Sequence, residues 1–432
     1  MRITFLNGLY PPHGAGGAET TLGWLAQQLA ARGHDCSVVS LTPHNSTSED
    51  KIDGIPVHYL PLANVLWPFG SDRPRALRPL YQIADAFNPI MQRRLASKLI
   101  QLRPDILHCH NLQGFSVSAW KAAARLGIPI VQTIHDYYLA CPRSAMWRPR
   151  QGNCRRACTE CRVFAAPRRA LSGHPAAVTC VSHRVFDRLV AAGSFAQAAR
   201  GLQPVRIIRG NNSDGPLPAP VPNPGSGIRL GFIGRIDPLK GLDALLDAMA
   251  VLPPTALSLR IAGTGAPDYV AALKAKAGSM SNVAFLGHVN PASFFATLDL
   301  LVIPSQWEDP FPRVFHEALA HGVPSLVTPL GGLPEVIEPG RTGFIAPGSD
   351  ATALAGAIME LLRNRWDYAT VRAACRAAAA RYAPSEVVAQ YEAVLTAAAH
   401  RTVVPEEAGE VWRPSVSGAR TTSAQQVACH GI

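Results

Sequence analysis

The stretch that decides the fold runs from residue 304 to residue 327 and reads PSQWEDPFPRVFHEALAHGVPSLV. Prolines disfavour a helix before Pro312, and Pro312 itself suits the first position of a helix, where no amide donor is needed. Apolar residues at helical spacing follow over 314–319, and Gly322 ends the helix. The apolar run 323–327 then predicts a buried strand. The stretch is therefore typical of a strand, loop, helix and strand in an α/β fold.

Two acidic residues of this stretch are candidates for binding a ligand. Asp309 falls in the predicted loop, and Glu317 falls on the helix outside its apolar stripe. The two carboxylates are eight positions apart and can reach opposite ends of one ligand, while amides of the first helical turn bind an anion between them. A structural alternative is an ion pair of Glu317 with Arg313 on an exposed face.

This pattern resembles the acid-x7-acid motif of retaining glycosyltransferases of family 4, where Glu-Pro-Phe-Gly precedes an apolar run and then Glu-Ala. The chain departs twice, because Asp309 replaces the first Glu and Pro312 replaces the Gly. Over residues 1–400 the resemblance implies the GT-B fold, an α/β fold with two Rossmann-like parallel-sheet domains that face each other across a cleft. It also implies transfer of a sugar from a nucleotide diphosphate sugar to a hydroxyl of a saccharide or lipid-linked acceptor, with retained anomeric configuration and no metal cofactor.

Length and composition favour a globular protein of two or three domains, since the chain has 432 residues and 47% of them are hydrophobic. No apolar window is long enough to span a membrane, and the first residues resemble a strand rather than an export signal, so we expect a cytoplasmic protein. The net charge of +11 suits nucleotide diphosphates, or peripheral contact with an anionic membrane. Nucleic acid is an alternative partner, but its recognition patterns are absent and we expect none.

The N-terminus predicts a β-loop-α-β unit of Rossmann type. Residues 3–6 and 36–41 are the expected strands, with a glycine-rich loop and a helix between them. Because Glu19 occupies a position where a dinucleotide fingerprint has glycine, a nicotinamide site is disfavoured. The loop is either a tight turn or a cradle for a diphosphate, and the cradle would use Gly14, Gly16 and Gly17.

Histidines follow two predicted strands, at the edge where open α/β sheets bind ligands. His108 and His110 end one strand, and His135 with Asp136 ends the next. These histidines are either hydrogen-bonded structural residues or part of the site. The resemblance implies that His135 lies close to the transferred sugar, and it keeps the other two as candidates.

An insert over residues 141–170 combines cysteines with arginines. Eight arginines and a single acid, Glu160, lie between Arg143 and Arg169, so this segment and Trp147 either line the acceptor entrance, contact anionic lipid or form a solvated face. The cysteine spacing is compatible with a structural zinc, with an iron–sulfur cluster or with ordinary reduced thiols. The metal ligands would be Cys141, Cys154, Cys158 and Cys161.

A second Rossmann-like unit begins after a proline-rich segment, with a strand that ends at Gly234. Arg235 and Lys240 flank a turn before the next helix, where two cations suit a diphosphate and would stabilise the leaving nucleotide. A pair of surface cations is the structural alternative.

The resemblance implies a role for each donor-side residue. Glu317 binds ribose hydroxyls, Asp309 binds hydroxyls of the donor sugar with Glu308 as its neighbour, and the base lies near residues 287–289. Together with the glycines of the first loop, the expected donor-binding residues are Gly234, Gly263, Gly265, His288, Val289, Phe311, Pro312, Arg313 and Val314.

Two alternatives remain open: a GT-B protein with other nucleotide-sugar chemistry, such as an epimerase or sugar-phosphate synthase, and a non-catalytic sugar-nucleotide-binding scaffold. The expected organisation is an N-terminal acceptor domain over 1–210, a linker over 211–227, a nucleotide-sugar domain over 228–384, a crossover helix over 385–400 and a flexible tail over 401–432.

Overall fold

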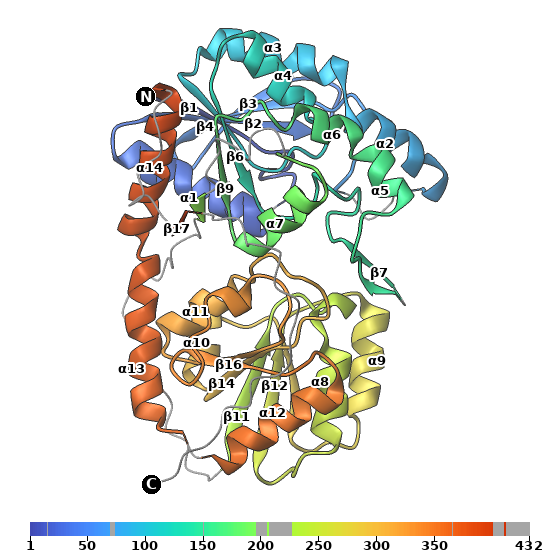
Figure 1. Cartoon of the computed structure of the whole chain (residues 1–432), viewed down its shortest axis with the longest axis vertical. Helices are drawn as coiled ribbons and strands as arrows, with labels where there is room; N and C mark the ends of the chain where they lie inside the picture. Colours follow the sequence, from blue (N-terminus) through green and yellow to red (C-terminus); the bar gives the residue numbers. More distant parts are fainter. Residues whose placement is uncertain are drawn as a thin grey trace.

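The protein forms two α/β domains, stacked along its longest axis (Figure 1). The structure is a computed structural model, and it describes residues 1–14, 16–69, 74–149, 151–195, 205–206, 227–364, 366–400 and 410–411. Each domain is built on one sheet whose strands are mostly parallel, which confirms the predicted fold class. The predicted linker, apart from residue 227, and most of the predicted tail lie outside the described residues.

The N-terminal domain holds a nine-stranded sheet with the order β17-β10-β9-β6-β5-β1-β2-β4-β3. All neighbouring strands are parallel except β3 with β4 and β17 with β10. The winding reverses at the centre, because the chain runs outward from β1 to β2 on one side and from β5 to β6 on the other. The strands are β1 Arg2–Leu6, β2 Asp35–Thr42, β3 Ser48–Ile52, β4 Ile55–Pro61, β5 Ile106–Cys109, β6 Ile130–Ile134, β9 Ala177–Cys180, β10 Val205–Arg206 and β17 Glu410–Val411.

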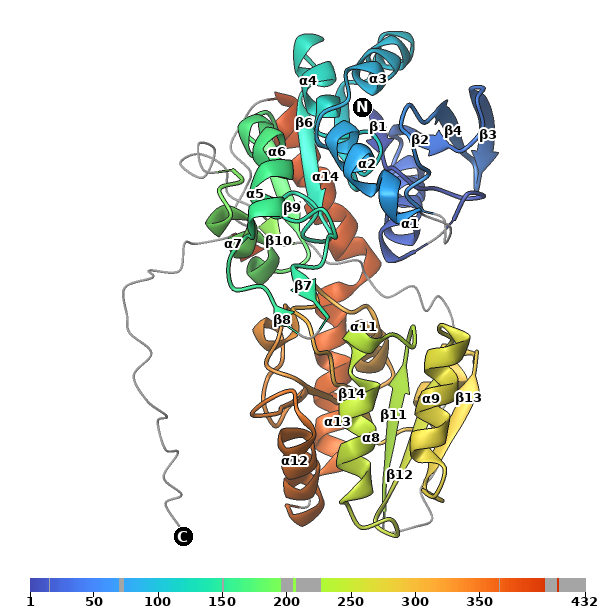
Figure 2. The ribbon, with the colours of Figure 1, turned by 90° about the vertical axis from the view of Figure 1, so that its right-hand side faces the viewer.

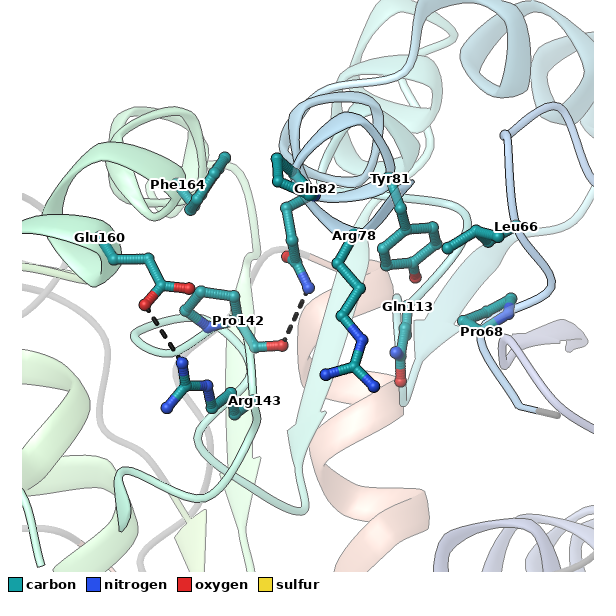
Figure 3. Close-up of a pocket in the computed structure, with 11 residues that line it drawn as sticks. Leu66, Pro68, Arg78, Tyr81, Gln82, Gln113, Pro142, Arg143, Glu160 and Phe164 are labelled. Atoms are coloured by element: carbon teal, nitrogen blue, oxygen red, sulfur yellow. Dashed lines mark hydrogen bonds and ion pairs between the residues drawn. The ribbon is translucent and has the colours of Figure 1, made fainter. Parts of the chain in front are cut away.

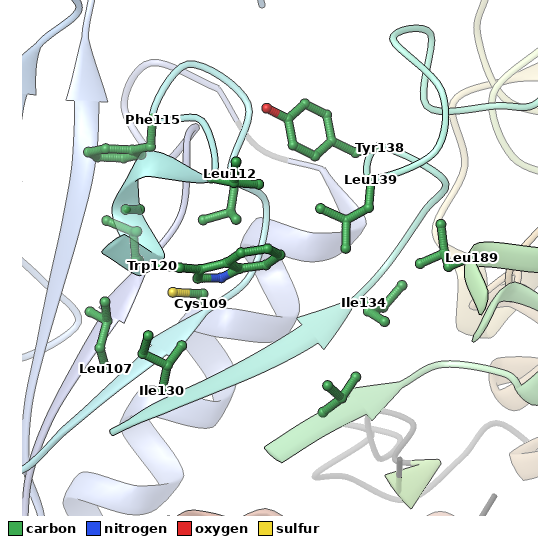
Figure 4. Close-up of a cluster of buried hydrophobic side chains, with 14 of the residues drawn as sticks. Leu107, Cys109, Leu112, Phe115, Trp120, Ile130, Ile134, Tyr138, Leu139 and Leu189 are labelled. Atoms are coloured by element: carbon green, nitrogen blue, oxygen red, sulfur yellow. The ribbon is translucent and has the colours of Figure 1, made fainter. Parts of the chain in front are cut away.

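Helices cover both faces of this sheet and enclose two apolar cores. The larger core surrounds Trp120 (Figure 4). The indole N–H of Trp120 donates to Oε1 of Gln132 at 3.0 Å. A hairpin of two short strands extends toward the other domain (Figures 1 and 2). The helices are α1 Gly17–Ala31, α2 Arg78–Ala86, α3 Pro89–Leu102, α4 Ser118–Arg125, α5 Thr159–Phe164, α6 Ala166–Leu171 and α7 His183–Ala191, and the hairpin is β7 Trp147–Arg148 with β8 Gly152–Asn153.

The C-terminal domain holds a six-stranded, all-parallel sheet with the order β13-β12-β11-β14-β15-β16. This is the doubly wound Rossmann order, and its direction reverses between β11 and β14. The strands are β11 Ile228–Ile233, β12 Leu257–Ala262, β13 Val283–Gly287, β14 Leu300–Ile303, β15 Ser325–Val327 and β16 Gly343–Ile345, and the helices are α8 Leu242–Ala250, α9 Pro267–Ala277, α10 Pro291–Ala296, α11 Val314–Ala320, α12 Ala351–Arg363 and α13 Tyr368–Ala379.

The last long helix, α14 Pro384–His400, returns to the N-terminal domain and lies beside α1 (Figure 1). Its apolar face, which includes Tyr391 and Leu395, joins the second core of that domain. At its edge, Glu392 pairs with Arg32 at 2.8 Å and with the His34 ring at 2.9 Å. The two domains are therefore tied together by a helix that follows both of them in the sequence.

A fully buried ion pair fixes α2 against the insert. Nη2 of Arg168, on α6, lies 2.9 Å from Oδ2 of Asp85, on α2, and both side chains are at most 1% exposed. The Tyr138 hydroxyl and the Gly114 amide also donate to Asp85, at 2.8 and 2.6 Å. Burial raises the pKa of the Asp85 carboxyl, and the guanidinium opposes that shift. One arginine of the insert is thus structural rather than part of a charged surface.

Removing one member of this buried ion pair should lower the free energy of unfolding far more than removing one member of an exposed ion pair. Arg168→Ala leaves an uncompensated buried carboxylate, so we expect a loss of ~3–5 kcal/mol in the free energy of unfolding, measured by urea denaturation. Arg2→Ala is the control, because Arg2 and Asp105 are 49% and 41% exposed and such pairs contribute below about 1 kcal/mol. Equal losses in the two variants would contradict a structural role for the buried pair.

Candidate functional site

Two predicted site residues meet at the point where the C-terminal sheet reverses direction. Lys240 follows β11 and Asp309 follows β14, and Nζ of Lys240 donates to Oδ2 of Asp309 at 2.5 Å. The lysine side chain is 22% exposed and the aspartate side chain 9%. Because a doubly wound sheet binds its ligands at this reversal, the pair stands at the expected place for a nucleotide.

Arg235 also follows β11 but does not join that pair. Its side chain is 70% exposed, and its Nε lies 3.6 Å from Oδ2 of Asp237. An exposed ion pair of this length restrains the side chain weakly. The guanidinium is therefore free to move toward an anion at the strand ends.

Two glycines allow the loops around the pair to approach each other. Gly263 has a φ of +131°, and a β-carbon there would lie 1.8 Å from the Gly234 carbonyl oxygen. Gly331 has a φ of +72°, and a β-carbon there would lie 2.0 Å from the Asp309 carbonyl oxygen. Any side chain at either position would displace the loop, so Gly331 directly fixes the backbone of Asp309.

The second predicted acid lies on α11 as expected, but it has a partner. Nη2 of Arg313 is 3.4 Å from Oε1 of Glu317, and the two side chains are 43% and 27% exposed. The structural alternative considered for Glu317 is therefore present in this structure. Such a pair is weak, so it does not prevent Glu317 from binding a ligand hydroxyl.

The glycine loop of the N-terminal domain faces α11 across the domain interface. A β-carbon at Gly17 would lie 3.6 Å from Cδ of Arg313. Gly16 and Gly17 are exposed at the start of α1, while Glu19 is buried and accepts a hydrogen bond from Asn7 at 2.9 Å. The start of α1 thus presents open backbone toward Arg313 of the other domain.

The three strand-end histidines form one contiguous cluster. Nδ1 of His110 lies 2.9 Å from Nε2 of His135 with the rings stacked, and Nε2 of His108 lies 2.7 Å from the Thr133 hydroxyl. Burial lowers the pKa of His108 to about 3 and that of His135 to about 4. The rings are therefore neutral at physiological pH and act as hydrogen-bonding groups rather than as cations.

Asp136, which follows His135, is a second unusual acid of this domain. Burial raises the pKa of its carboxyl to about 6, against hydrogen bonding from the Tyr138 amide. His135, Asp136 and Tyr138 line a cavity of about 20 Å³, the size of one water molecule.

Sequence reasoning missed the contacts that join the two domains. Glu308, next to Asp309, is 8% exposed; its carboxylate accepts a hydrogen bond from Arg184 of α7 and forms an ion pair with Nε of Arg188, also on α7, at 2.9 Å. The Tyr137 hydroxyl donates to the Glu308 carbonyl oxygen at 2.8 Å. Glu308 therefore binds the N-terminal domain and does not share the role expected of Asp309. Adjacent acids with different roles leave no signal in a single sequence.

Two further contacts reinforce this junction. The amide of Asn153, in the insert hairpin, donates to the Gln306 carbonyl oxygen at 3.1 Å and accepts from the Glu308 N–H at 2.9 Å. Glu335 accepts from the first two backbone N–H groups of α7, at 2.9 and 2.6 Å. The insert thus positions the loop that carries Asp309.

The cysteines of the insert do not form the expected metal site. In the described part of the chain, no group of three or more His, Cys, Asp or Glu side chains is placed to hold a metal ion. Among Cys141, Cys154, Cys158 and Cys161, the sulfur of Cys158 accepts from Nη2 of Arg148 at 2.9 Å, and Cys141 is hydrogen-bonded to Cys161. The arrangement of these cysteines therefore does not support zinc.

The remaining predicted donor residues lie around the same strand ends. His288 is exposed and Val289 is half-buried just after β13. Phe311 stacks on His316 with ring centroids 4.8 Å apart. Helix α11 begins at Val314 rather than at Pro312, because Pro312 and Arg313 still belong to the loop.

In the described residues, no helix is long and apolar enough to span a membrane.

Comparisons with known proteins agree with this geometry. A family model described as "Glycosyl transferase 4-like domain" matches residues 16–201, and one described as "Glycosyl transferases group 1" matches residues 227–364. An uncharacterized 42.6 kDa protein in the cps region of Klebsiella pneumoniae is 28% identical over 78% of this chain and 87% of its own length. The phosphatidyl-myo-inositol mannosyltransferase of Mycobacterium leprae is 29% identical, over 72% of this chain and 79% of its own.

Among solved structures, HepE of Anabaena in complex with UDP and glucose superposes with a TM-score of 0.66 at 22% identity, and the match covers 92% of this chain and 99% of that one. At this identity the likeness establishes the fold, which is GT-B. The chain is therefore a glycosyltransferase with the GT-B fold. This assignment to the glycosyltransferases argues against the two alternatives, an epimerase and a scaffold without activity.

Acid should destabilise the protein partly through His108. Its folded-state pKa of about 3 lies below the ordinary 6.5, so the unfolded chain binds more protons between these values. The stability contributed by the neutral ring is present above pH 6.5 and is lost as the pH falls toward 3. When the pH is lowered from about 7 to about 5, the free energy of unfolding should fall in both proteins. The fall should be smaller by about 2 kcal/mol in His108→Gln than in the unmodified protein.

Urea denaturation at each pH measures this difference. His288→Gln, which changes an exposed ring, is the control and should follow the unmodified protein. A His108→Gln variant that loses as much stability on acidification as the control would show that His108 is not held neutral.

Proposed function

We propose that the protein transfers a sugar from a nucleotide diphosphate sugar to a hydroxyl group of a saccharide or lipid-linked acceptor, with retention of the anomeric configuration. The observation that carries the proposal is the contact between Lys240 and Asp309 where the strand order reverses. It supplies an ammonium for the diphosphate and a carboxylate for sugar hydroxyls at one point. Names of relatives support assembly of a glycolipid or polysaccharide, since one acts on phosphatidyl-myo-inositol and another lies in a cps region.

The leaving diphosphate is stabilised by cations in this proposal. A donor that enters at the strand ends displaces Lys240 from Asp309 and draws in the mobile Arg235. Both cations then oppose the charge that develops as the sugar–phosphate bond breaks, an electrostatic effect that is strongest in a site from which water is excluded. Asp309, released from the lysine, accepts hydrogen bonds from the donor sugar, and Glu317 accepts from the ribose.

The acceptor and the transferred sugar meet between the domains. His135 is neutral and stacked, so it offers a hydrogen bond to the sugar without adding charge. The glycine loop at Gly16 and Gly17 opens backbone amides toward the diphosphate. A leaving phosphate oxygen takes the acceptor proton on the same face, which retains the configuration and requires no nucleophile from the protein. The enzyme then works in the cytoplasm, at the inner face of the membrane when the acceptor is a lipid.

Removing either donor-side cation should lower turnover without unfolding the protein. We expect Lys240→Ala and Arg235→Ala each to lower kcat by roughly 100-fold or more, as for the loss of a group that stabilises transition-state charge. Release of nucleotide from a matched nucleotide sugar gives the rate. Lys276→Ala is the control, because this lysine lies on α9 and pairs with Asp243 and Asp247 rather than with Asp309.

Arg235→Ala keeps this test independent of folding, since its side chain is 70% exposed. If both variants turn over at the rate of Lys276→Ala, the assignment of the diphosphate site is wrong.

Stereochemistry tests the mechanism separately. A panel of nucleotide diphosphate sugars identifies the donor by thermal shift, because a ligand that binds only the folded state raises its stability by mass action. Proton NMR of the product with that donor should show the same anomeric configuration as the donor. An inverted product would refute the retaining mechanism while leaving the donor site intact.

A further inference from the structure

A second cavity lies within the N-terminal domain, separate from the Lys240–Asp309 pair. Its volume is about 550 Å³, which is in the range of small-molecule sites. It opens between α2, the loop after β5 and the start of the insert (Figure 3). The lining residues that matter below are Arg78, Tyr81 and Gln82 of α2, Gln113 of the loop, and Arg143 and Phe164 of the insert.

The cavity borders the reversal point of the N-terminal sheet. The chain turns to opposite sides after β1 and after β5, and Gln113 follows β5 by four residues. The two loops are in close contact, because a β-carbon at Gly8 would lie 2.2 Å from the Gln113 carbonyl oxygen. Ligands of doubly wound sheets bind at such points, so the position favours a binding site rather than a packing gap.

A polar atom at this cavity has unfilled hydrogen-bonding capacity. Oε1 of Gln82 is buried and has no hydrogen-bond partner within the described residues, whereas the buried Tyr81 hydroxyl interacts with Gln113 and Asp85. The Gln82 amide is held in place, because its Nε2 donates to the Pro142 carbonyl oxygen at 3.2 Å (Figure 3). Buried polar groups are almost always paired, and a hydroxyl group of a saccharide would pair with this oxygen.

The cavity also has an uncompensated positive charge. Arg143 is paired with Glu160 at 3.3 Å, whereas Arg78 forms no ion pair with any acid in the described part of the chain. Figure 3 shows the Arg78 guanidinium beside Gln113, directed across the cavity rather than away from it. A free guanidinium favours a phosphate, to which it can donate two parallel hydrogen bonds.

An apolar surface adjoins the cavity. Leu80 and Ile83, on the outer side of α2, are 53% and 61% exposed, and Val163 of the neighbouring α5 is 62% exposed. Val163 directly precedes Phe164, which lines the cavity. Large apolar side chains gathered on one surface mark a contact with an apolar partner.

We propose that this cavity is the acceptor subsite and that its ligand is an amphiphilic saccharide phosphate. The sugar pairs with Gln82, the phosphate with Arg78, and the lipid chain lies along Leu80 and Ile83. This rests on the proposed function and narrows its acceptor to one that carries a phosphate and an apolar chain together.

Three probes separate these features, each titrated into the full chain by calorimetry. Glucosyl decyl phosphate carries sugar, phosphate and chain; decyl glucoside lacks the phosphate; glucose 1-phosphate lacks the chain. We expect the complete probe to bind at least about tenfold more tightly than either partial one, since a charge-assisted hydrogen bond and a buried chain each contribute at that level. Equal affinity for all three, or no binding of the complete probe, overturns the proposal.

Variants assign each feature to its residues. Arg78→Ala should bring the complete probe to the affinity of decyl glucoside, and Leu80→Ser with Ile83→Ser to that of glucose 1-phosphate. Arg125→Ala, on α4, and Ile100→Ser, a 59% exposed residue of α3, are matched controls that should change nothing. A control that weakens binding as much as its counterpart would show a general surface effect and overturn the proposal.

Failure here is distinguishable from failure of the proposed function. Lys240→Ala should keep its affinity for the complete probe while its turnover falls. Probe binding without binding of any nucleotide sugar would leave the cavity assignment standing and remove the donor site. Binding of a nucleotide sugar without binding of the probe would leave the donor site standing and remove the cavity assignment.

Discussion

Parallel pairing is the constraint on which the rest of the structure depends. In a parallel sheet, the carboxyl ends of all strands share one edge, and a reversal of winding separates two neighbouring loops at that edge. Each sheet of this protein has one such reversal, between β1 and β5 and between β11 and β14. Lys240 and Asp309 are 69 residues apart in the chain and meet because of it. The contact between Lys240 and Asp309 is thus a consequence of strand order.

The loop after β14 serves both domains at once. Glu308 binds α7 of the N-terminal domain, while the next residue, Asp309, binds Lys240. Asn153 of the insert holds the same loop through its backbone. Because neighbouring residues cannot move independently, the approach of the domains and the position of the Asp309 carboxylate are coupled. The insert therefore carries exposed charges and also has a structural role, because Asn153 holds the loop after β14 and Arg168 is buried against Asp85.

Much of the fold could be predicted from the sequence because its signals are local. The parallel strands and their helices follow from apolar runs ended by glycine, as at residues 257–262, which form β12 as expected. The β3–β4 hairpin went unpredicted, although Asp53-Gly54 between two short strands is a turn signal.

The candidate site is less predictable, since pairs such as Asp85 with Arg168 are set by tertiary packing over 83 residues. The cysteine spacing leaves a structural zinc, an iron–sulfur cluster and reduced thiols open, and the hydrogen bond from Arg148 to Cys158 cannot be foreseen from that spacing. Adjacent acids at 308 and 309 likewise diverge in role only because the two domains approach each other.

Helix α14 has a consequence for the order in which the protein is made. Val387, Tyr391 and Leu395 complete a core whose members outside α14 lie in the first 180 residues of the chain and include residues of β1, β2 and α1. During translation, the first half emerges from the ribosome with this apolar surface uncovered until the final helix follows. The N-terminal half is therefore an incomplete folding unit by itself, and its native burial depends on a segment synthesised only after the whole second domain.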